Sequence, residues 1–213
     1  MENIDVELFS ILKEKIIETA LDRFMQYGIR NMTIMRLVEP LGISTKTVYK
    51  YFTSKEELLS ECLNLLYDGY FNELNLIGKS NDNAVNKLLI MFRSAFSKDF
   101  GLNHEFFHDL NYYYPELQNA AINRTRQNYG MVMVPLVENG IAEGYFHNFI
   151  NPLFALEGIS TLYSSITRSE RYKNYKGDIS EVFKNLVEVY IRGMCTPKGI
   201  EVFEKDPYHK DQA

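Results

Sequence analysis

One pentapeptide in the chain has the residue types and spacing of a zinc site. It reads His104-Glu105-Phe106-Phe107-His108, so two histidines lie four residues apart with a glutamate beside the first. On a helix the two imidazoles would share one face and could bind Zn²⁺, while the carboxylate of Glu105 could act as a general base. A catalytic zinc also needs a third protein ligand and an open coordination position.

The expected positions do not supply that third ligand. The extended form of the motif has glycine at position 111 and histidine at position 114, where this chain has Asn111 and Tyr114. A carboxylate farther along, Glu138 or Glu143, is conceivable but has no supporting context. Three interpretations therefore stay open: ordinary helix histidines, a metal-responsive site, or a zinc hydrolase.

A second stretch concentrates positive charge. Residues 40–55, PLGISTKTVYKYFTSK, contain three lysines and no acidic residue. Residues 1–55 hold 8 Lys or Arg and 7 Asp or Glu, whereas residues 56–213 hold 15 and 21. The overall net charge of −5 therefore conceals a cationic segment of the kind that contact with DNA phosphates requires.

The elements around this stretch have the layout of a helix-turn-helix unit. Apolar residues recur with helical spacing from about 6 to 27. A short helix should begin after Thr33 as N-cap and should end or distort at Pro40. Gly42 marks a sharp turn, and Ser44 should cap a second short helix. Such a pair can place its second helix in the major groove of DNA.

The rest of the chain also has helical periodicity, and no window alternates as a strand would. A capping box at Ser54–Glu57 should open a helix that runs to about residue 77. The later helices are expected at about 84–100, 104–113, 115–143, 151–167 and 178–194. The predicted fold class is therefore all-α, with about nine helices.

Residues 13–66 contain a set of residues whose types and relative positions form a recognisable pattern. Its members are Ala20, Phe24, Gly28, Thr33, Ile34, Gly42, Ile43, Ser44, Thr47, Val48, Tyr49, Tyr51, Phe52, Lys55 and Leu58. In this set the segment resembles the DNA-binding domain of TetR/AcrR-family transcriptional regulators. Pro40 departs from the family, which usually has a small, helix-compatible residue there.

The resemblance implies a sequence-specific transcriptional regulator, usually a ligand-responsive repressor, that binds a near-palindromic operator in double-stranded DNA as a homodimer. It implies a helix-turn-helix domain at 1–55 and a helical ligand-binding and dimerisation domain at 56–195. Residues 196–213 are polar and are expected to form a C-terminal tail that is ordered only in part. The dimer interface would use the helices at about 151–167 and 178–194. An unknown small-molecule effector would act on DNA binding, with no enzymatic activity and no cofactor.

The residues expected to contact DNA follow from the matched positions. The predicted set is Thr33, Ser44, Thr45, Lys46, Thr47, Tyr49, Lys50, Tyr51 and Lys55. Its early members on the second short helix should reach base edges, and the later ones should contact phosphates. Thr33 and Lys55 cap the flanking helices, whose N-termini also favour phosphate. Phe52 is expected to pack in the core.

Aromatic residues are frequent in the second half of the chain. Most should be core, but a subset together with inward-facing polar groups could line a pocket for an apolar or planar ligand. The candidate set is Phe92, Phe96, Phe107, Asp109, Tyr113, Asn128, Glu138 and Glu157. Aromatic rings beside carboxylates could also suit a cationic ligand.

The composition excludes several classes of protein. The chain has 213 residues, 46% hydrophobic and 24% charged, which is ordinary for a globular protein. Cys62 and Cys195 are too few for a disulfide framework and are expected to be reduced, as in a cytoplasmic protein. No secretion signal and no apolar stretch of about 18 residues is apparent, so no membrane partner is expected.

Two alternatives to a DNA-binding regulator remain. An enzyme has the histidine pair as its only support, because neither GxGxxG nor GxSxG occurs and no nucleophile triad or P-loop accompanies it. A protein-binding scaffold that kept the fold would use its dimer surface instead. Selection of a DNA sequence by the purified protein separates these hypotheses.

Overall fold

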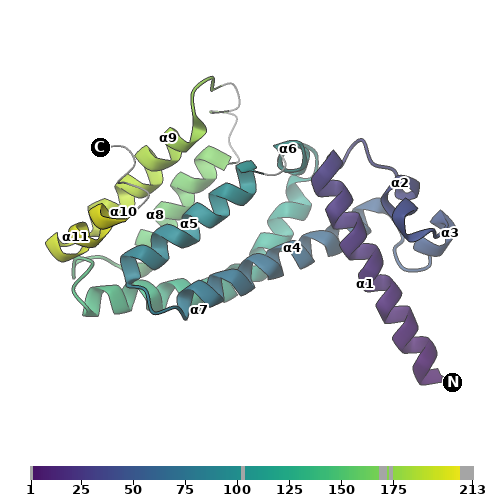
Figure 1. The fold of residues 1–213 in the computed structure, drawn as a ribbon, viewed down its shortest axis with the longest axis horizontal. Helices are drawn as coiled ribbons and strands as arrows, with labels where there is room; N and C mark the ends of the chain where they lie inside the picture. Colours follow the sequence, from purple (N-terminus) through teal and green to yellow (C-terminus); the bar gives the residue numbers. More distant parts are fainter. Residues whose placement is uncertain (1, 102–103, 168–171, 173–174, 207–213) are drawn as a thin grey trace. The chain divides into compact units, whose positions relative to one another are not determined.

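Helices form the regular secondary structure of the part of the chain that the structure describes. This computed structural model describes residues 2–101, 104–167, 172 and 175–206 (Figure 1). Among these residues the only pairing of strand type is one isolated bridge between Phe146 and Cys195. The all-α fold expected from the sequence is confirmed.

Packing groups the chain into two compact units. Unit 1 comprises Met1–Phe71 and Lys98–Arg126, and unit 2 comprises Asn72–Ser97 and Gln127–Ala213. The two units are defined by packing contacts, whereas the boundaries predicted after residues 55 and 195 separate functions. Those functional boundaries therefore stay a prediction. None of the described helices is long and apolar enough to cross a membrane.

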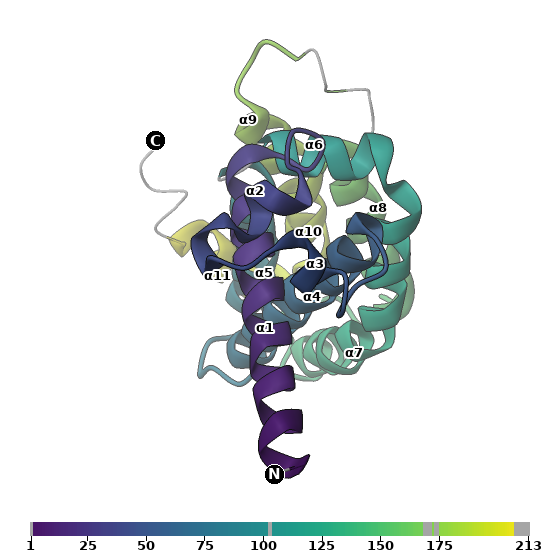
Figure 2. The ribbon, with the colours of Figure 1, turned by 90° about the vertical axis from the view of Figure 1, so that its right-hand side faces the viewer.

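Unit 1 is built around the long first helix. Its elements are α1 (Glu2–Tyr27), α2 (Ile34–Val38), the 3₁₀ turn η1 (Glu39–Leu41), α3 (Thr45–Val48), the first part of α4 (Lys55–Gly78), α6 (His104–Tyr113) and the start of α7 (Pro115–Ala142). The first turns of α1 reach beyond α2 and α3 (Figure 2).

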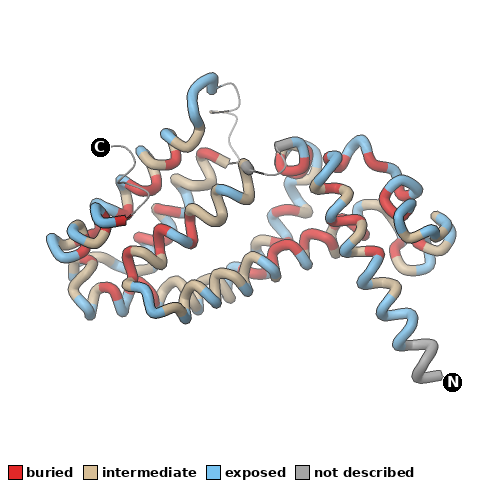
Figure 3. The backbone as a smooth tube through the Cα atoms, viewed as in Figure 1, coloured by how far each residue is buried: buried red, intermediate tan, exposed pale blue. Residues whose placement is uncertain are grey.

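The core of unit 1 follows the predicted apolar stripe. Ile16, Ala20 and Phe24 of α1 are fully buried, together with Leu37 of α2 and Val48 of α3. Burial is concentrated where α1 meets the short helices, and the N-terminal turns of α1 are exposed from residue 7 to residue 11 (Figure 3). The core therefore fixes the two short helices against α1.

Three local signals begin α2, end it and turn the chain toward the next helix, as the sequence predicts. Thr33 accepts a hydrogen bond from the backbone N–H of Arg36 at 3.3 Å and caps α2. The α-helix stops at Val38, and Pro40 lies in the 3₁₀ turn that follows. Gly42 then takes a left-handed conformation with φ +63°, which glycine adopts at little cost.

Unit 2 is a second helical bundle. It contains the end of α4, most of α5 (Ala84–Gly101) and of α7, then α8 (Pro152–Thr167), α9 (Ile179–Phe183), a π-helical turn (Lys184–Glu188), α10 (Val189–Met194) and α11 (Pro197–Lys205). The sequence predicts one helix over 178–194, and the π-helical turn inside that run was not expected. Helix α8 packs against α9 and this turn.

A buried ion triad joins three elements of unit 2. Arg93 of α5 lies 2.6 Å (Nε to Oε1) from Glu188 in the π-helical turn and 2.9 Å (Nη1 to Oδ1) from Asp206 after α11. Both carboxylates are buried. Because an unpaired buried charge is costly, the three side chains hold these elements together.

The C-terminal tail expected from residue 196 contains an ordered helix, α11, over residues 197–205. Thr196 caps this helix, with its hydroxyl accepting from the backbone N–H of Gly199 at 3.3 Å, and Pro197 occupies the first turn. Phe203 is buried. A threonine before a proline is a helix-start signal that the overall polarity of the segment masked.

Candidate DNA-binding site

The second short helix, α3, is fixed at its start and along one side. Ser44 caps it, as predicted, by accepting from the backbone N–H of Thr47 at 3.1 Å, and the Ser44 and Thr47 hydroxyl oxygens lie 3.0 Å apart. Val48 on the inner side has no exposed surface. Thr45 is half-buried at the first turn. The helix is therefore rigidly placed while its outer side stays open.

The outer side of α3 and of the turn after it carries the exposed cations. Lys46 and Lys50 are exposed, and Tyr49 has 54% of its surface exposed. No carboxylate in the described part of the chain forms an ion pair with either lysine. These three side chains are available to a partner with negative charge, as the sequence predicts for DNA phosphate.

Tyr51 and Phe52 have different surroundings from Tyr49. Phe52 is buried in the core of unit 1, which confirms its predicted packing role. The half-buried ring of Tyr51 stacks on Phe9 of α1, with ring centres 4.2 Å apart and an interplanar angle of 28°. The first turns of α1 therefore orient Tyr51, and its contact with phosphate stays a prediction.

Lys55 points into unit 1 at the start of α4. Its Nζ donates to the backbone carbonyl of Ile29 at 2.6 Å and lies 5.8 Å from the ring centre of Phe24. Burial lowers the pKa of Lys55, against the opposing influence of the nearby Glu56 and Asp109 carboxylates. The ammonium group thus has a partner within the protein, and phosphate contact by Lys55 stays a prediction.

The capping box before α4 forms with one change. Ser54 accepts from the backbone N–H of Glu57 at 3.1 Å, as predicted. The Glu57 carboxylate accepts from the hydroxyl and the backbone N–H of Thr53 instead of returning to Ser54, and these bonds lower the pKa of Glu57. The start of α4, which comes directly after the DNA-binding helices, is therefore well defined.

Arg36 was not in the predicted set. It is exposed on α2, and one of its guanidinium nitrogens donates to the carbonyl of Asn31 at 3.3 Å. The first helix of a helix-turn-helix pair crosses the DNA backbone. A basic residue three positions after the predicted Thr33 cap was a visible signal for a phosphate contact.

The predicted ligand-binding residues are divided between the two units. Phe107, Asp109 and Tyr113 belong to unit 1, and the remaining five belong to unit 2. Phe107 is buried in the core of unit 1, and the Asp109 carboxylate accepts from two backbone N–H groups. Tyr113 is exposed under the guanidinium of Arg30, 4.0 Å from its ring centre.

The five residues in unit 2 also have separate environments. Phe92 is buried beside Tyr163, and Phe96 lies against Phe183 with ring centres 4.6 Å apart. Asn128 is half-buried. The expectation that Glu138 and Glu157 face the interior is wrong, because both are exposed. Acidic residues at helical spacing do not reveal which side of the helix is covered.

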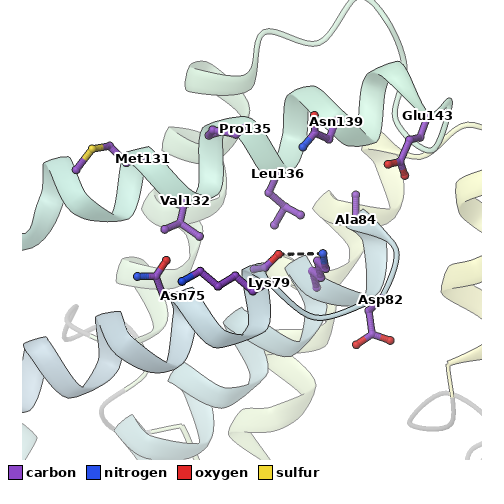
Figure 4. A pocket seen from close by; sticks show the side chains of 12 residues that line it. Asn75, Lys79, Asp82, Ala84, Met131, Val132, Pro135, Leu136, Asn139 and Glu143 are labelled. Atoms are coloured by element: carbon purple, nitrogen blue, oxygen red, sulfur yellow. Dashed lines mark hydrogen bonds between the residues drawn. The ribbon is translucent and has the colours of Figure 1, made fainter.

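Unit 2 also has a pocket where α4 ends and α5 begins, facing the second half of α7 (Figure 4). Its volume is about 270 Å³, and no predicted ligand residue lines it. The lining side chains include Asn75, Lys79, Asp82, Val132, Leu136 and Glu143. At its floor the Nζ of Lys87 donates to the carbonyl of Gly78 at 2.9 Å.

The histidine pair on α6 is only partly described. His108 is half-buried, and its ring stacks on Tyr112 with centres 5.9 Å apart. The side chain of His104 lies outside the described residues, so the pair stays a hypothesis. Among the side chains that are described, no three His, Cys, Asp or Glu residues come together as a metal site would require.

Comparison with known proteins gives the family context of the short helices. A family model described as bacterial regulatory proteins, tetR family, matches residues 16–62. The chain is 28% identical over 190 residues to YuxN, an HTH-type transcriptional regulator of Bacillus subtilis, covering 85% of this chain and 64% of YuxN. It is also 28% identical over 140 residues to the HTH-type transcriptional repressor KstR2 of Mycobacterium tuberculosis, covering 62% of this chain and 68% of KstR2.

A solved structure shares the helical fold over most of this chain. The transcriptional regulator FadR of Bacillus subtilis, in complex with stearoyl-CoA, superposes with a TM-score of 0.64 at 18% identity. The likeness covers 84% of this chain and 98% of FadR. At this identity the comparison establishes the fold.

Proposed function

We propose that this chain, whose residues 16–62 match the model of the tetR family of bacterial regulatory proteins, is a transcriptional repressor that binds a near-palindromic operator as a homodimer and responds to a small-molecule effector. The observation that carries this proposal is the outer side of α3. There Lys46 on α3 and Lys50 on the turn after it are exposed, and Val48 anchors the other side of the helix.

We propose that the residues of α3 contact DNA bases and that the residues of the turn after it contact the DNA backbone. Thr45, Lys46 and Thr47 lie in the first turn after the Ser44 cap, which is the part of a recognition helix that reaches base edges. Tyr49, Lys50 and Tyr51 come next, where phosphate contacts would fix the register on DNA. Thr33, the cap of α2, and Arg36 on α2 would add contacts to the DNA phosphates.

Exposed apolar side chains on adjacent helices of unit 2 support the proposed dimer. Leu153 and Phe154 of α8 have 64% and 72% of their surface exposed, and Val189 of α10 has 57% exposed. Large exposed apolar residues are frequent at interfaces between subunits. We therefore propose an interface on α8 and on the run from α9 to α10.

We infer an apolar effector from the aromatic residues of unit 2. The helices of unit 2 carry many aromatic residues, among them Phe92, Phe96, Tyr163 and Phe183, which contact one another. FadR, which shares the fold, was solved with stearoyl-CoA. A long-chain acyl-CoA is therefore a suitable first probe for an effector that releases DNA.

The deciding experiment is selection from a random pool of duplex DNA. The wild type should enrich an inverted repeat, and a Lys46→Ala/Tyr49→Ala variant should not, because it loses exposed groups on or next to α3. Lys176→Ala, which removes an exposed lysine of unit 2 away from the pocket, is the matched control and should select the same sequence. No enrichment with or without acyl-CoA, by a protein that is an intact dimer, would favour the scaffold alternative.

A further inference from the structure

The turn between α1 and α2 is held from two sides by residues far away in the sequence. Gly28 ends α1 with φ +77°. The next two backbone N–H groups, of Ile29 and Arg30, both donate to Oδ2 of Asp109 at 2.9 Å. On the other side, the carbonyl of Ile29 accepts from Lys55.

Asp109 lies on α6 and is suited to this contact by its surroundings. Its side chain is buried within unit 1, and Ile29 has no exposed surface. A Cβ at Gly28 would lie 3.2 Å from Oδ2 of Asp109, so the glycine leaves room for the carboxylate. From the next turn of α6, Tyr113 stacks under the guanidinium of Arg30.

This contact bears on DNA binding because the turn leads directly into the two short helices. Thr33, the cap of α2, comes three residues after Arg30, and α2 packs directly on α3. Without Asp109, two N–H groups at the turn would lose their acceptor, and burial of such groups is costly. The turn would then shift to reach water, and the start of α2 would move with it.

We propose that Asp109 is a positioning residue for DNA binding: its carboxylate, supplied by α6, fixes the turn that sets the start of α2 and so the placement of α3. This inference rests on the proposed function. Asp109 lies outside the predicted DNA-binding segment 1–55. Its carboxylate nevertheless positions the turn and the short helices within that segment. A residue expected in a ligand pocket thus acts on the DNA-binding helices.

The test compares three variants of the full chain. Asp109→Ala removes the acceptor, and Asp109→Asn keeps a carbonyl oxygen that can accept both N–H groups. Leu110→Ala, at the neighbouring fully buried core position, lowers stability but leaves the Asp109 carboxylate and the two N–H groups that it accepts from in place. Two quantities are measured at a temperature where every variant is folded: amide hydrogen exchange at Ile29 and Arg30, and affinity for the selected operator at fixed salt.

The expected result separates positioning from general stability. Asp109→Ala should speed exchange at both amides and weaken operator binding, each by about tenfold. Asp109→Asn should recover most of both, and Leu110→Ala should leave both within about twofold of the wild type despite a lower melting temperature.

Two outcomes would overturn the inference, and they differ from failure of the proposed function. Operator binding by Asp109→Ala equal to that of the wild type would show that the turn does not control α3. Equal weakening by Leu110→Ala and Asp109→Ala would reduce the role of Asp109 to stability. If the wild type itself selects no DNA, the proposed function fails and this inference fails with it.

Discussion

A single hydrogen bond changes what is expected of Lys55. The sequence places it among phosphate-contacting lysines, whereas its Nζ donates to the Ile29 carbonyl. We expect Lys55→Ala to lower the free energy of unfolding by about 1–2 kcal/mol, because it removes a charge-assisted bond. Operator affinity should fall for all sequences with little change in its salt dependence.

The matched variant for that prediction is Lys50→Ala, which removes an exposed lysine. It should reduce the slope of log affinity against log salt by about 1, as loss of one phosphate contact does, and should leave stability unchanged. Binding titrations at several salt concentrations give both slopes. If both variants reduced the salt slope equally, Lys55 would contact a DNA phosphate.

The two cysteines are expected to be unreactive in the folded protein. Both are buried, and burial raises the pKa of Cys195 to about 11 and raises that of Cys62 well above its ordinary value. Because the thiolate is the reactive form, Ellman's reagent should label neither at pH 7.5 and should label both in urea. Labelling of the native protein within minutes would contradict this.

The same shifts predict a loss of stability at alkaline pH. A folded pKa above the unfolded value means that the contribution to stability is fully present below the unfolded pKa, near 9.0 for Cys195. It is lost as pH rises through the folded pKa of about 11. Urea denaturation of Cys195→Ala should therefore show a shallower decline between these pH values than the wild type.

At the scale of elements, Pro135 is the irregular point of α7. It lies inside the helix and has no N–H to donate to the carbonyl of Met131. Both residues line the pocket of unit 2. We expect Pro135→Ala to raise the free energy of unfolding by about 1–3 kcal/mol in urea denaturation.

Pro115 provides the control for that measurement. It is the first residue of α7, where proline is well tolerated because no intrahelical N–H bond is lost. Pro115→Ala should therefore change stability by less than about 0.5 kcal/mol. If Pro135→Ala destabilises the protein, the packing of unit 2 requires proline at this position of α7.

Local signals account for the elements that the sequence predicts well. Thr33 and Ser44 cap their helices within three residues, so neighbouring sequence contains the whole interaction. The bond from Ile29 to Asp109 joins residues 80 positions apart, and no periodicity reveals it. For the same reason Lys55 could be predicted as a cation on α4 but not as a partner of Ile29.

At the scale of the whole molecule, the proposed homodimer predicts a strong effect of charge on α8. Phe154 is 72% exposed within the single chain. Phe154→Arg should leave the melting temperature of the monomer nearly unchanged but should dissociate the dimer, because an unpaired charge would be buried at the interface. Light scattering coupled to size exclusion gives the mass directly.

Loss of the dimer should also weaken operator binding. An inverted repeat is bound tightly only when two linked DNA-binding heads engage both half-sites. Phe154→Arg should therefore bind one half-site about as well as the wild type and lose the advantage for the full repeat. Ser160→Arg, at another exposed position of α8, tests whether the interface extends along that helix. A dimeric Phe154→Arg protein would place the interface elsewhere.

The π-helical turn at Lys184–Glu188 has a consequence for how such an interface could change during evolution. A π turn accommodates one residue more than an α turn, so it offsets the helical phase of everything beyond it by about 100°. Deleting a single codon there would restore a regular helix and turn Val189 away from its present direction. The deletion would also move the Glu188 carboxylate away from its ion-pair partner Arg93. One small deletion could thus exchange the subunit-facing surface of α10 for another without altering any of its side chains.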